Sequence, residues 1–474
     1  EFFFFFPLKS SNVVIETTKD LDNILNYYSK FYTTQDIASA YGTDNNDIPL
    51  GWYDLDRGGF SSYIPFFLNS VEDLKESSFS PWKDEYGKIA YANIVLENLD
   101  KVTGTEEEKE ALKQEAHFIR AYSNFTLATI YCLPYSEENK DSPGLPRKTS
   151  MRYDQSLERQ SLEETFEFIE SDLQEALQTT KQRGDLWRFS LPAVNAFAAR
   201  LYLYKHDYDQ AMTYATAALN DHNSIVYTNE MVEPQRDYFT FYVDENLDTI
   251  EVNIQRPAIF WTRVGEPMHF DELYYARYLR LTQRFVPSQE LLDLFDADDM
   301  RRGYIIEHFS LFYTDNPDYA AWSYFNYSQF ALQGPTTTEM ILIRAECLAR
   351  QGSINAAMNE LESLREYRIE ETAYTPLPVP GTVLETLNLI VKERRMENPF
   401  VWRRYDIKRL NSDPENIVPK IEITRQFYPY VNGNVQYEDP LIEYTMTFDD
   451  KRWATPIPST EIILSKGQIE QNEY

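Results

Sequence analysis

The segment Ala199-Arg-Leu-Tyr-Leu-Tyr-Lys-His-Asp-Tyr-Asp-Gln-Ala211 joins an apolar helical pattern to a sharp turn and then to a second apolar pattern. A similar arrangement returns as Ala345-Glu-Cys-Leu-Ala-Arg-Gln-Gly-Ser-Ile-Asn-Ala-Ala357. In both segments two alanines stand 12 residues apart and bracket the turn, which falls at His206-Asp207 in the first and at Gly352-Ser353 in the second. Because small residues let two antiparallel helices approach closely, each segment predicts a helical hairpin.

These hairpins resemble tetratricopeptide repeats, in which a short turn returns the chain along the helix it has just formed. Tyr208 and Ile354 occupy matching places, as the apolar residue that enters the second helix of each hairpin. The repeat does not follow a regular period of about 34 residues throughout, so we predict divergent repeats separated by insertions. Two ordinary helical hairpins, unrelated by repetition, are the alternative.

Helix signals outside the hairpins extend the helical prediction. Thr105 precedes three glutamates, which suit a helix N-terminus, and Ser161 with Glu164 forms a capping-box pattern. We expect one mainly α unit spanning residues 1–474, with divergent tetratricopeptide-like repeats and long irregular insertions. Its helical scaffold is expected mainly in three ranges: 16–41, 81–220 and 335–410. Loop-rich insertions that face a ligand or a partner are expected in three further ranges: 42–80, 221–334 and 411–455.

The composition limits the possible functions. The 474 residues include 45 Lys and Arg against 76 Asp and Glu, which gives a formal charge of −31. Nucleic-acid binding and docking on an anionic membrane both depend on Lys and Arg, so neither is expected. The chain has only 15 glycines, few for a β-barrel or a dinucleotide-binding α/β protein, but 35 tyrosines. Since a tyrosine ring packs while its hydroxyl meets water, the composition suggests a helical protein that presents aromatic surface to a neutral polar ligand.

No catalytic or metal-binding motif stands out. None of the five histidines lies at metal-ligand spacing from another, and the sequence contains no HExxH, CxxC, Walker A, GxGxxG or GxSxG motif. We therefore expect no cofactor, no metal and no catalytic residue. A glycosidase with two carboxylates is an alternative, because acidic residues are abundant. The acidic clusters 44–47 and 296–299 are expected to be solvated surface, with calcium binding as the alternative.

Five motifs then occur in order along the chain. They are Trp82-Lys-Asp-Glu-Tyr-Gly-Lys-Ile-Ala-Tyr-Ala-Asn93, Glu115-Ala-His-Phe-Ile-Arg-Ala-Tyr122, Thr338-Glu-Met-Ile-Leu-Ile-Arg-Ala-Glu346, Glu393-Arg-Arg-Met-Glu397 with Arg403-Arg-Tyr-Asp-Ile-Lys-Arg409, and Pro456-Ile-Pro458 with Gln471-Asn472. Each motif is weak by itself. In this order and spacing, they resemble the SusD/RagB family of outer-membrane nutrient-binding lipoproteins.

The resemblance implies a SusD-like fold and a non-catalytic protein that binds an oligo- or polysaccharide at the cell surface. It implies a partner, a SusC-like TonB-dependent transporter, which the binding protein covers as a lid. It also implies attachment to the outer membrane through a lipidated N-terminal cysteine that would lie upstream of residue 1. An oligopeptide-binding lid of the RagB type is the alternative.

Two groups of residues follow from these considerations. Glu393, Arg394, Asp406 and Arg409 are expected to be structural, pairing with one another or capping backbone carbonyls. A neutral glycan offers C–H faces and hydroxyls, so aromatic rings flanked by polar side chains in the insertions are the candidate ligand contacts. In a chain so rich in aromatic residues, core packing is the alternative for each of them. The candidates are Trp52, Tyr53, Tyr63, Trp261, Tyr275 and Trp322.

Overall fold

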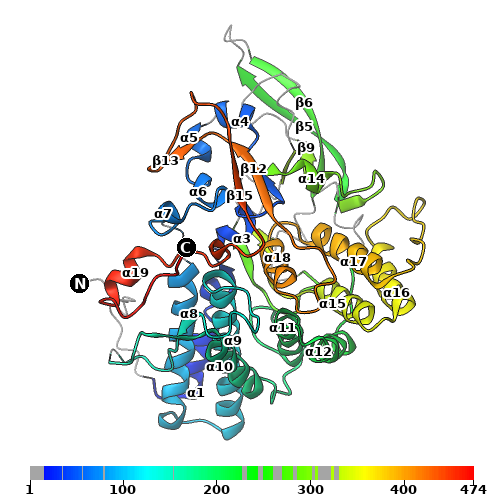
Figure 1. Cartoon of the computed structure of the whole chain (residues 1–474). Coiled ribbons are helices and arrows are strands. Elements are labelled where there is room, and N and C mark those ends of the chain that lie inside the picture. The colour runs from blue at the N-terminus through cyan, green and yellow to red at the C-terminus, as the bar shows by residue number, and fades with distance from the viewer. Residues whose placement is uncertain are drawn as a thin grey trace.

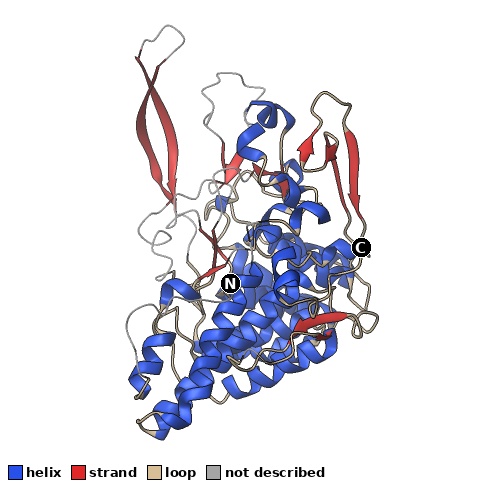
Figure 2. Ribbon diagram, turned by 90° about the vertical axis from the view of Figure 1, so that its left-hand side faces the viewer, coloured by secondary structure: helices blue, strands red, loops and turns tan. Residues whose placement is uncertain are grey.

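The computed structural model of the chain describes residues 15–34, 36–55, 57–77, 79, 81–152, 154–226, 232–243, 249–259, 270–280, 286–301, 305–307, 322–324 and 330–474. It has the mainly α architecture that the sequence predicts. The long helices fill the lower part of the molecule in Figure 1, and short helices and β-hairpins form the upper part. Figure 2 shows the same division from the side.

The lower part begins with antiparallel helices that pack on one another: α8 (Pro81–Asn98), α9 (Glu106–Tyr131) and α10 (Leu162–Ala176). Helix α1 (Thr18–Leu25) lies against α8 and α9. The predicted helix starts are confirmed, because Thr105 and Ser161 are N-caps that form capping boxes with the glutamates three residues later. The 3₁₀ turn η1 (Leu99–Lys101) connects α8 towards α9.

Both predicted hairpins are confirmed. The first is α11 (Leu191–Tyr204) with α12 (Tyr208–Asp221), and the second is α15 (Thr337–Arg350) with α16 (Ile354–Arg365). Each turn contains one residue with positive φ, His206 at 63° and Gly352 at 77°. The four bracketing alanines are completely buried. Helix α12 packs on α15, so the two hairpins stack although a long insertion separates them in the chain.

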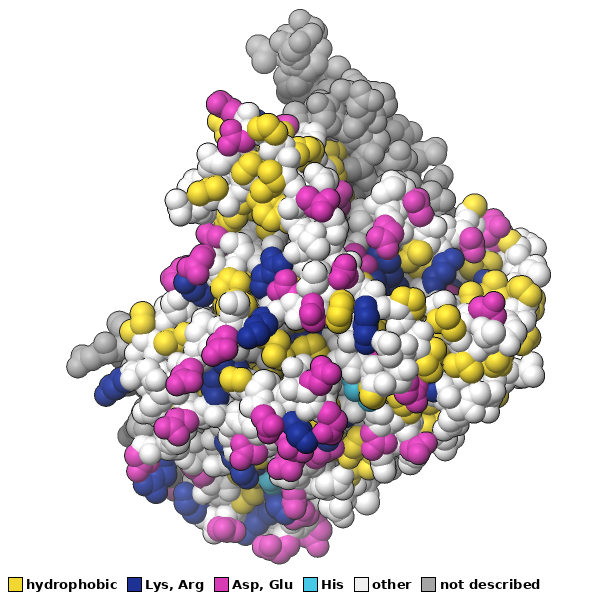
Figure 3. All heavy atoms as spheres, viewed as in Figure 1, with side chains coloured by type: hydrophobic (Ala, Val, Ile, Leu, Met, Phe, Trp, Pro, Cys, Tyr) yellow, Lys and Arg dark blue, Asp and Glu magenta, His cyan; other side chains and the backbone are white. Residues whose placement is uncertain are grey.

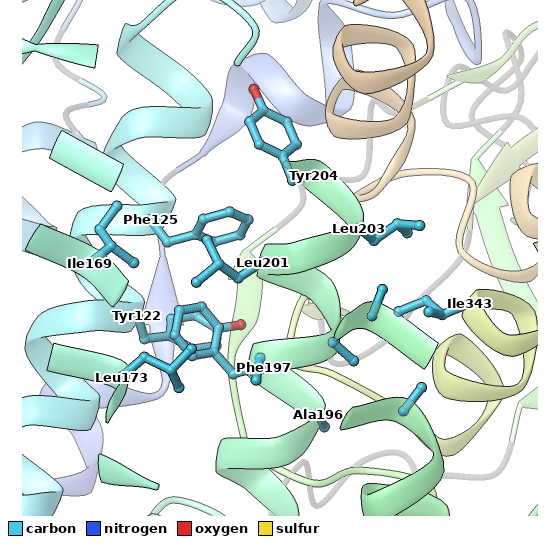
Figure 4. Close-up of a cluster of buried hydrophobic side chains, with 14 of the residues drawn as sticks. Tyr122, Phe125, Ile169, Leu173, Ala196, Phe197, Leu201, Leu203, Tyr204 and Ile343 are labelled. Atoms are coloured by element: carbon cyan, nitrogen blue, oxygen red, sulfur yellow. The ribbon is translucent and has the colours of Figure 1, made fainter. Parts of the chain in front are cut away.

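Helix α17 (Val383–Glu397) continues this stack against α15 and α16, and α18 (Arg403–Asn411) follows it. Figure 4 shows the core that joins α9 and α10 to the first hairpin, with the rings of Tyr122, Phe125 and Phe197 at its centre. The Phe197 ring lies 5.0 Å from that of Tyr122 and 5.6 Å from that of Phe125. This continuous apolar core makes the lower part a rigid support for the upper one.

Two predictions for the N-terminal region are wrong in detail. The helical range 16–41 is broken into α1, α2 (Tyr28–Phe31) and α3 (Ile37–Tyr41). The range 42–80, expected to form loops, contains four short helices: α4 (Leu50–Leu55), α5 (Arg57–Phe60), α6 (Ile64–Phe67) and α7 (Val71–Leu74). Helices of four to six residues are too short to show a 3.6-residue period, which explains the error.

Apart from the long pair β5 and β6, the described strands have two to five residues, and most are paired in twos. One three-stranded sheet has the order β1 (Thr33–Thr34), β7 (Tyr278–Arg280), β11 (Phe330–Leu332). The two-stranded pairs are β2 (Asn46–Asp47) with β8 (Val286–Pro287), β3 (Pro143–Pro146) with β4 (Arg159–Ser161), β5 (Val232–Val243) with β6 (Thr249–Ile259), β9 (Ile305–Glu307) with β10 (Trp322–Tyr324), β12 (Ile423–Phe427) with β15 (Ile442–Met446), and β13 (Tyr430–Val431) with β14 (Asn434–Val435). The remaining elements are α14 (Gln289–Leu292), η5 (Lys451–Trp453) and α19 (Ser459–Leu464).

The charged residues of the fourth motif are structural, as predicted. Arg394 Nε lies 2.8 Å from Asp406 Oδ2, and its Nη2 lies 3.2 Å from Glu339 Oε1. Arg409 Nε reaches Asp406 Oδ1 at 2.8 Å, while Glu393 pairs with Arg301 instead. Burial alone would lower the pKa of Arg394, but Asp406 and Glu339 outweigh it and raise the pKa. The guanidinium therefore stays charged in the interior.

The two acidic clusters do not form solvated surface throughout, which corrects the prediction. Asp44 is held by Arg403 at 2.5 Å and by Arg395 at 3.3 Å, and Asp299 is held by Arg301 at 2.6 Å. Within the part of the chain that the structure describes, no three His, Cys, Asp or Glu side chains are grouped so that they could hold a metal. Among the described helices, none combines the length and the apolar character needed to cross a bilayer.

Candidate functional site

The structure buries four of the six aromatic candidates. Trp52 and Tyr53 lie in α4, Tyr63 precedes α6 and Tyr275 precedes β7, with exposed fractions of 3%, 4%, 8% and 1%. Tyr63 stacks on Tyr41 at 4.6 Å, and Tyr275 packs edge-on against Phe118 at 4.9 Å. Their expected exposure in loops is therefore wrong, and the core-packing alternative is right for these four.

The other two candidates stay predictions. Trp261 lies outside the described residues. Trp322 is the first residue of β10, and only its backbone is described. Strand β10 packs against β8, which pairs with β2 just before α4. The fold thus brings the backbone of Trp322 to the region of Trp52 and Tyr53, while Tyr275 lies among the long helices.

The strand β12 covers the buried residues Trp52 and Tyr53. The Tyr53 ring packs on Phe427 at 5.2 Å and on Tyr428 at 6.0 Å, so the strand β12 and the residue after it lie directly over α4. Phe427 is completely buried, while Tyr428 is half-buried. Trp52 and Tyr53 therefore support a surface built from the C-terminal hairpins. The sequence pattern identified the buried rings below this surface and missed the residues that form the surface itself.

We call this surface the tyrosine face and define it by Asp54, Arg57, Tyr428 and Tyr437. The Tyr428 hydroxyl donates to Asp54 Oδ2 at 3.1 Å, and Arg57 Nη2 donates to Asp54 Oδ1 at 3.1 Å. The Arg57 guanidinium lies 3.6 Å from the centre of the Tyr437 ring, which is 44% exposed. Two aromatic rings and an ion pair thus share one patch of surface.

Exposed apolar side chains lie on the hairpins that carry the tyrosine face. Val431 belongs to β13, Leu441 directly precedes β15, and Ile442 pairs in β15 with Phe427, the residue before Tyr428. In Figure 3, hydrophobic side chains gather in the upper part of the molecule, where β13 and α5 lie in Figure 1. Such a patch with polar groups within it is typical of an interaction site.

The turn residues of the hairpin β13–β14 determine its position. Asn432 and Gly433 both have positive φ, at 50° and 76°, and connect β13 to β14. An Asn-Gly pair favours such a two-residue turn, because both residues tolerate this backbone conformation. The Tyr444 hydroxyl accepts from Tyr430 N at 2.9 Å and donates to Tyr428 O at 3.1 Å. The two hairpins are therefore joined, and the Asn-Gly pair is the sequence signal that could have located this surface.

The titration behaviour of the face suits a neutral ligand. Burial and the hydrogen bond to Asp54 raise the pKa of Tyr428, so its hydroxyl stays protonated at neutral pH. The hydrogen bond from Arg57 to Asp54 raises the pKa of Arg57, which keeps its charge. Because Asp54 and Arg57 face each other, the patch has polar groups but little net charge. It can stack against an apolar face and exchange hydrogen bonds with hydroxyls.

Comparisons with known proteins point to one family. A family model described as starch-binding and associating with the outer membrane (SusD-like) matches residues 60–203, and a second model, the SusD family (SusD/RagB), matches residues 337–474. A curated relative, SusD-like protein P2 of Formosa agariphila, is 22% identical over 439 residues, covering 82% of this chain and 79% of its own.

Solved structures agree on the fold. A SusD superfamily protein from Bacteroides thetaiotaomicron superposes with a TM-score of 0.68 at 17% identity, covering 97% of this chain and 100% of that one. A SusD-like carbohydrate-binding protein from Bacteroides vulgatus gives 0.65 at 16% identity, covering 96% of this chain and 97% of its own.

Proposed function

Because the chain belongs to the SusD/RagB family, we propose that it is a non-catalytic glycan-binding component of a SusC/SusD-type TonB-dependent uptake system. Its ligand would be a neutral oligo- or polysaccharide captured at the cell surface. The observation that supports this most directly is the tyrosine face, where the exposed ring of Tyr437, the half-buried ring of Tyr428 and a compensated ion pair lie together on a rigid support.

The chemistry of the face fits a sugar. A pyranose ring has apolar C–H faces and a rim of hydroxyls, so it gains from an aromatic ring below it and from hydrogen-bonding groups beside it. Tyr437 would supply the ring, and Asp54 and Arg57 the polar groups. The formal charge of −31 disfavours acidic polysaccharides, because they would be repelled.

The wider role follows from the family. The protein would sit on the outer membrane, held by a lipid anchor, and would cover a SusC-like TonB-dependent transporter as a lid. The family description that matches residues 60–203, with its reference to the outer membrane, supports this placement. Co-purification of a transporter barrel with the tagged protein from its native membrane tests it.

Binding is tested by calorimetry against soluble starch, laminarin, xyloglucan, galactomannan and alginate. We expect binding to at least one neutral polymer and none to alginate. Tyr437→Ala should weaken that binding about tenfold, which corresponds to the loss of about 1.4 kcal/mol. Tyr437→Phe should keep most of the affinity, because the ring stays. Ile463→Ala changes a side chain that is 73% exposed on α19 and serves as the control.

Two results would contradict the proposal. Binding to no polymer of the panel would remove the glycan as ligand, and a basic peptide found in its place would favour the oligopeptide alternative. Release of reducing sugars that a single Asp or Glu substitution abolishes would show a glycosidase instead of a binding protein.

A further inference from the structure

A second exposed aromatic surface lies on the helical part of the molecule. We call it the aromatic platform and define it by Tyr28, Tyr32 and Trp187. Tyr28 is 51% exposed, and its ring lies 5.9 Å from Tyr32, nearly parallel at 25°. The Trp187 ring lies 6.0 Å from that of Tyr28, tilted by 56°, and both Tyr32 and Trp187 are half-buried. Three neighbouring rings thus form one surface.

The platform is fixed from below. Tyr32 packs edge-on against Tyr278 at 6.2 Å, and Tyr278 is 1% exposed. The Trp187 indole Nε1 donates to Asn26 Oδ1 at 3.0 Å, which orients the indole ring. Buried aromatic contact on one side and a hydrogen bond on the other hold the rings before any ligand arrives. Such preorganisation lowers the entropic cost of binding.

The charges beside the platform compensate one another. Asp22 pairs with Lys19 at 3.0 Å and with Arg188 at 2.9 Å, and Arg188 also pairs with Glu115 at 2.6 Å. Burial alone would lower the pKa of Arg188, but Glu115 and Asp22 outweigh it and raise the pKa. Of these side chains Lys19 and Asp22 are the accessible ones, and they pair with each other. The polar groups beside the rings therefore carry no dominant charge, which favours a neutral partner over an ionic one.

We propose that the aromatic platform is a second carbohydrate-binding site, which takes the C–H faces of a neutral polysaccharide. This inference rests on the proposed function and goes beyond it, because it places a second contact away from the tyrosine face. Helix α1, which leads to the platform, lies among the long helices, whereas α4 and α5 lie in the upper part of Figure 1. Two separate sites on one rigid body would bind a long polymer more tightly than a short fragment, through effective concentration.

The test uses short and long forms of the same sugar, taken from the polymer that the panel identifies. For a short oligosaccharide we expect calorimetry to give two bound molecules per protein. Tyr28→Ala with Trp187→Ala should leave one, and should weaken binding of the full polymer about tenfold or more. Tyr437→Ala should likewise leave one molecule, held by the platform. Ile463→Ala should behave as the wild type.

Fluorescence adds a signal specific to the platform. Trp52, Trp82, Trp402 and Trp453 are buried, so Trp187 is the tryptophan with an accessible ring among the described side chains. The short oligosaccharide should shift or quench wild-type emission, and the part of this change that Trp187→Phe removes reports on the platform. Trp187→Phe keeps an aromatic ring and should retain binding. It therefore tests the platform even if the double variant Tyr28→Ala with Trp187→Ala fails to fold.

The outcomes separate the two proposals. Binding to no polymer overturns both. The protein could bind the polymer but have only one site for the short oligosaccharide. If Tyr437→Ala removes that site and Tyr28→Ala with Trp187→Ala leaves it intact, the aromatic platform is not a binding site, while the proposed function stands. If saturating oligosaccharide changes the emission of the wild type and of Trp187→Phe by the same amount, Trp187 does not sense the ligand, which also overturns the proposal of a second site. The proposal of a second site is supported if the wild type binds two short oligosaccharides and the platform substitutions remove one of them.

Discussion

At the scale of single residues, the buried charges were the most predictable feature. The motif that contains Arg394 also contains its partner Asp406, and a buried guanidinium needs several acceptors. The exposed rings were not predictable from sequence. Trp52 and Tyr437 both have polar neighbours in the chain, yet one lies in the core and the other on the surface. Only the packing of β12 over α4 decides this, and that contact joins segments far apart in sequence.

Arg394→Met tests the buried network. The substitution removes the guanidinium that lies between Asp406 and Glu339, whose exposed fractions are 4% and 0%. Each of these buried carboxylates is then left with one arginine fewer, Asp406 with Arg409 and Glu339 with Arg200. We expect the free energy of unfolding, measured by urea denaturation, to fall by about 3–5 kcal/mol. Arg152→Met is the matched control, since its pair with Asp154 is mostly exposed and its loss should cost less than about 1 kcal/mol. Equal effects of the two substitutions would contradict the assignment.

His206 makes stability depend on pH. Burial lowers the pKa of its imidazole from the usual 6.5 to about 4, with Arg409 and Arg350 adding to this effect and Asp413 opposing it. Between pH 6.5 and 4 the unfolded chain therefore binds a proton that the folded protein does not, so stability falls as the pH falls through this window.

His206→Asn isolates this contribution, since asparagine tolerates the positive φ at the turn. Urea denaturation at several pH values should show that the wild type loses about 2 kcal/mol more than the variant between the two pH limits. Parallel stability curves for the two proteins would show that His206 does not titrate as described.

At the scale of elements, length decided what could be predicted. The hairpins α11–α12 and α15–α16 have long apolar patterns and turn residues with a clear role, and both were found from the sequence. The helices between residues 50 and 74 have four to six residues and were missed. The hairpin β13–β14 was missed as well, although Asn432-Gly433 is a recognisable turn signal.

Helix caps offer a matched pair of substitutions. The Thr382 side chain accepts from Glu385 N at the start of α17, within a capping box, whereas Ser353 makes no side-chain capping bond at the start of α16. Thr382→Ala should lower the free energy of unfolding by about 1 kcal/mol, and Ser353→Ala should change it by much less. Urea denaturation of both variants measures the difference, and a larger loss for Ser353→Ala would refute the assignment of the cap.

At the scale of the whole molecule, the family and the mainly α class were predictable because ordered motifs and helical periods survive in a single sequence. The arrangement of the insertions was not. The tyrosine face is built from α4 and α5 together with the C-terminal hairpins, and the hydrogen bond from Tyr428 to Asp54 spans 374 residues. No local pattern encodes a contact at that separation.

The total charge separates the two ligand classes by experiment. A neutral glycan held by stacking and hydrogen bonds should keep its dissociation constant within about twofold when ionic strength rises from roughly 50 to 500 mM. A basic peptide attracted by a charge of −31 should bind at least about tenfold more weakly at the higher salt concentration. Calorimetry at the two salt concentrations makes the measurement, and strong salt dependence would favour the oligopeptide alternative.

The ion pair between Arg403 and Asp44 has a consequence for biosynthesis. These residues are 359 positions apart, and Arg404 and Arg425 from the same C-terminal portion donate to Gly42 O and Thr43 O. Until the C-terminal portion of the chain is present, the acidic side chain and these carbonyls have no guanidinium to meet them. The region around Trp52 therefore completes its folding only together with that portion, and a chain truncated before residue 403 would leave its rings exposed.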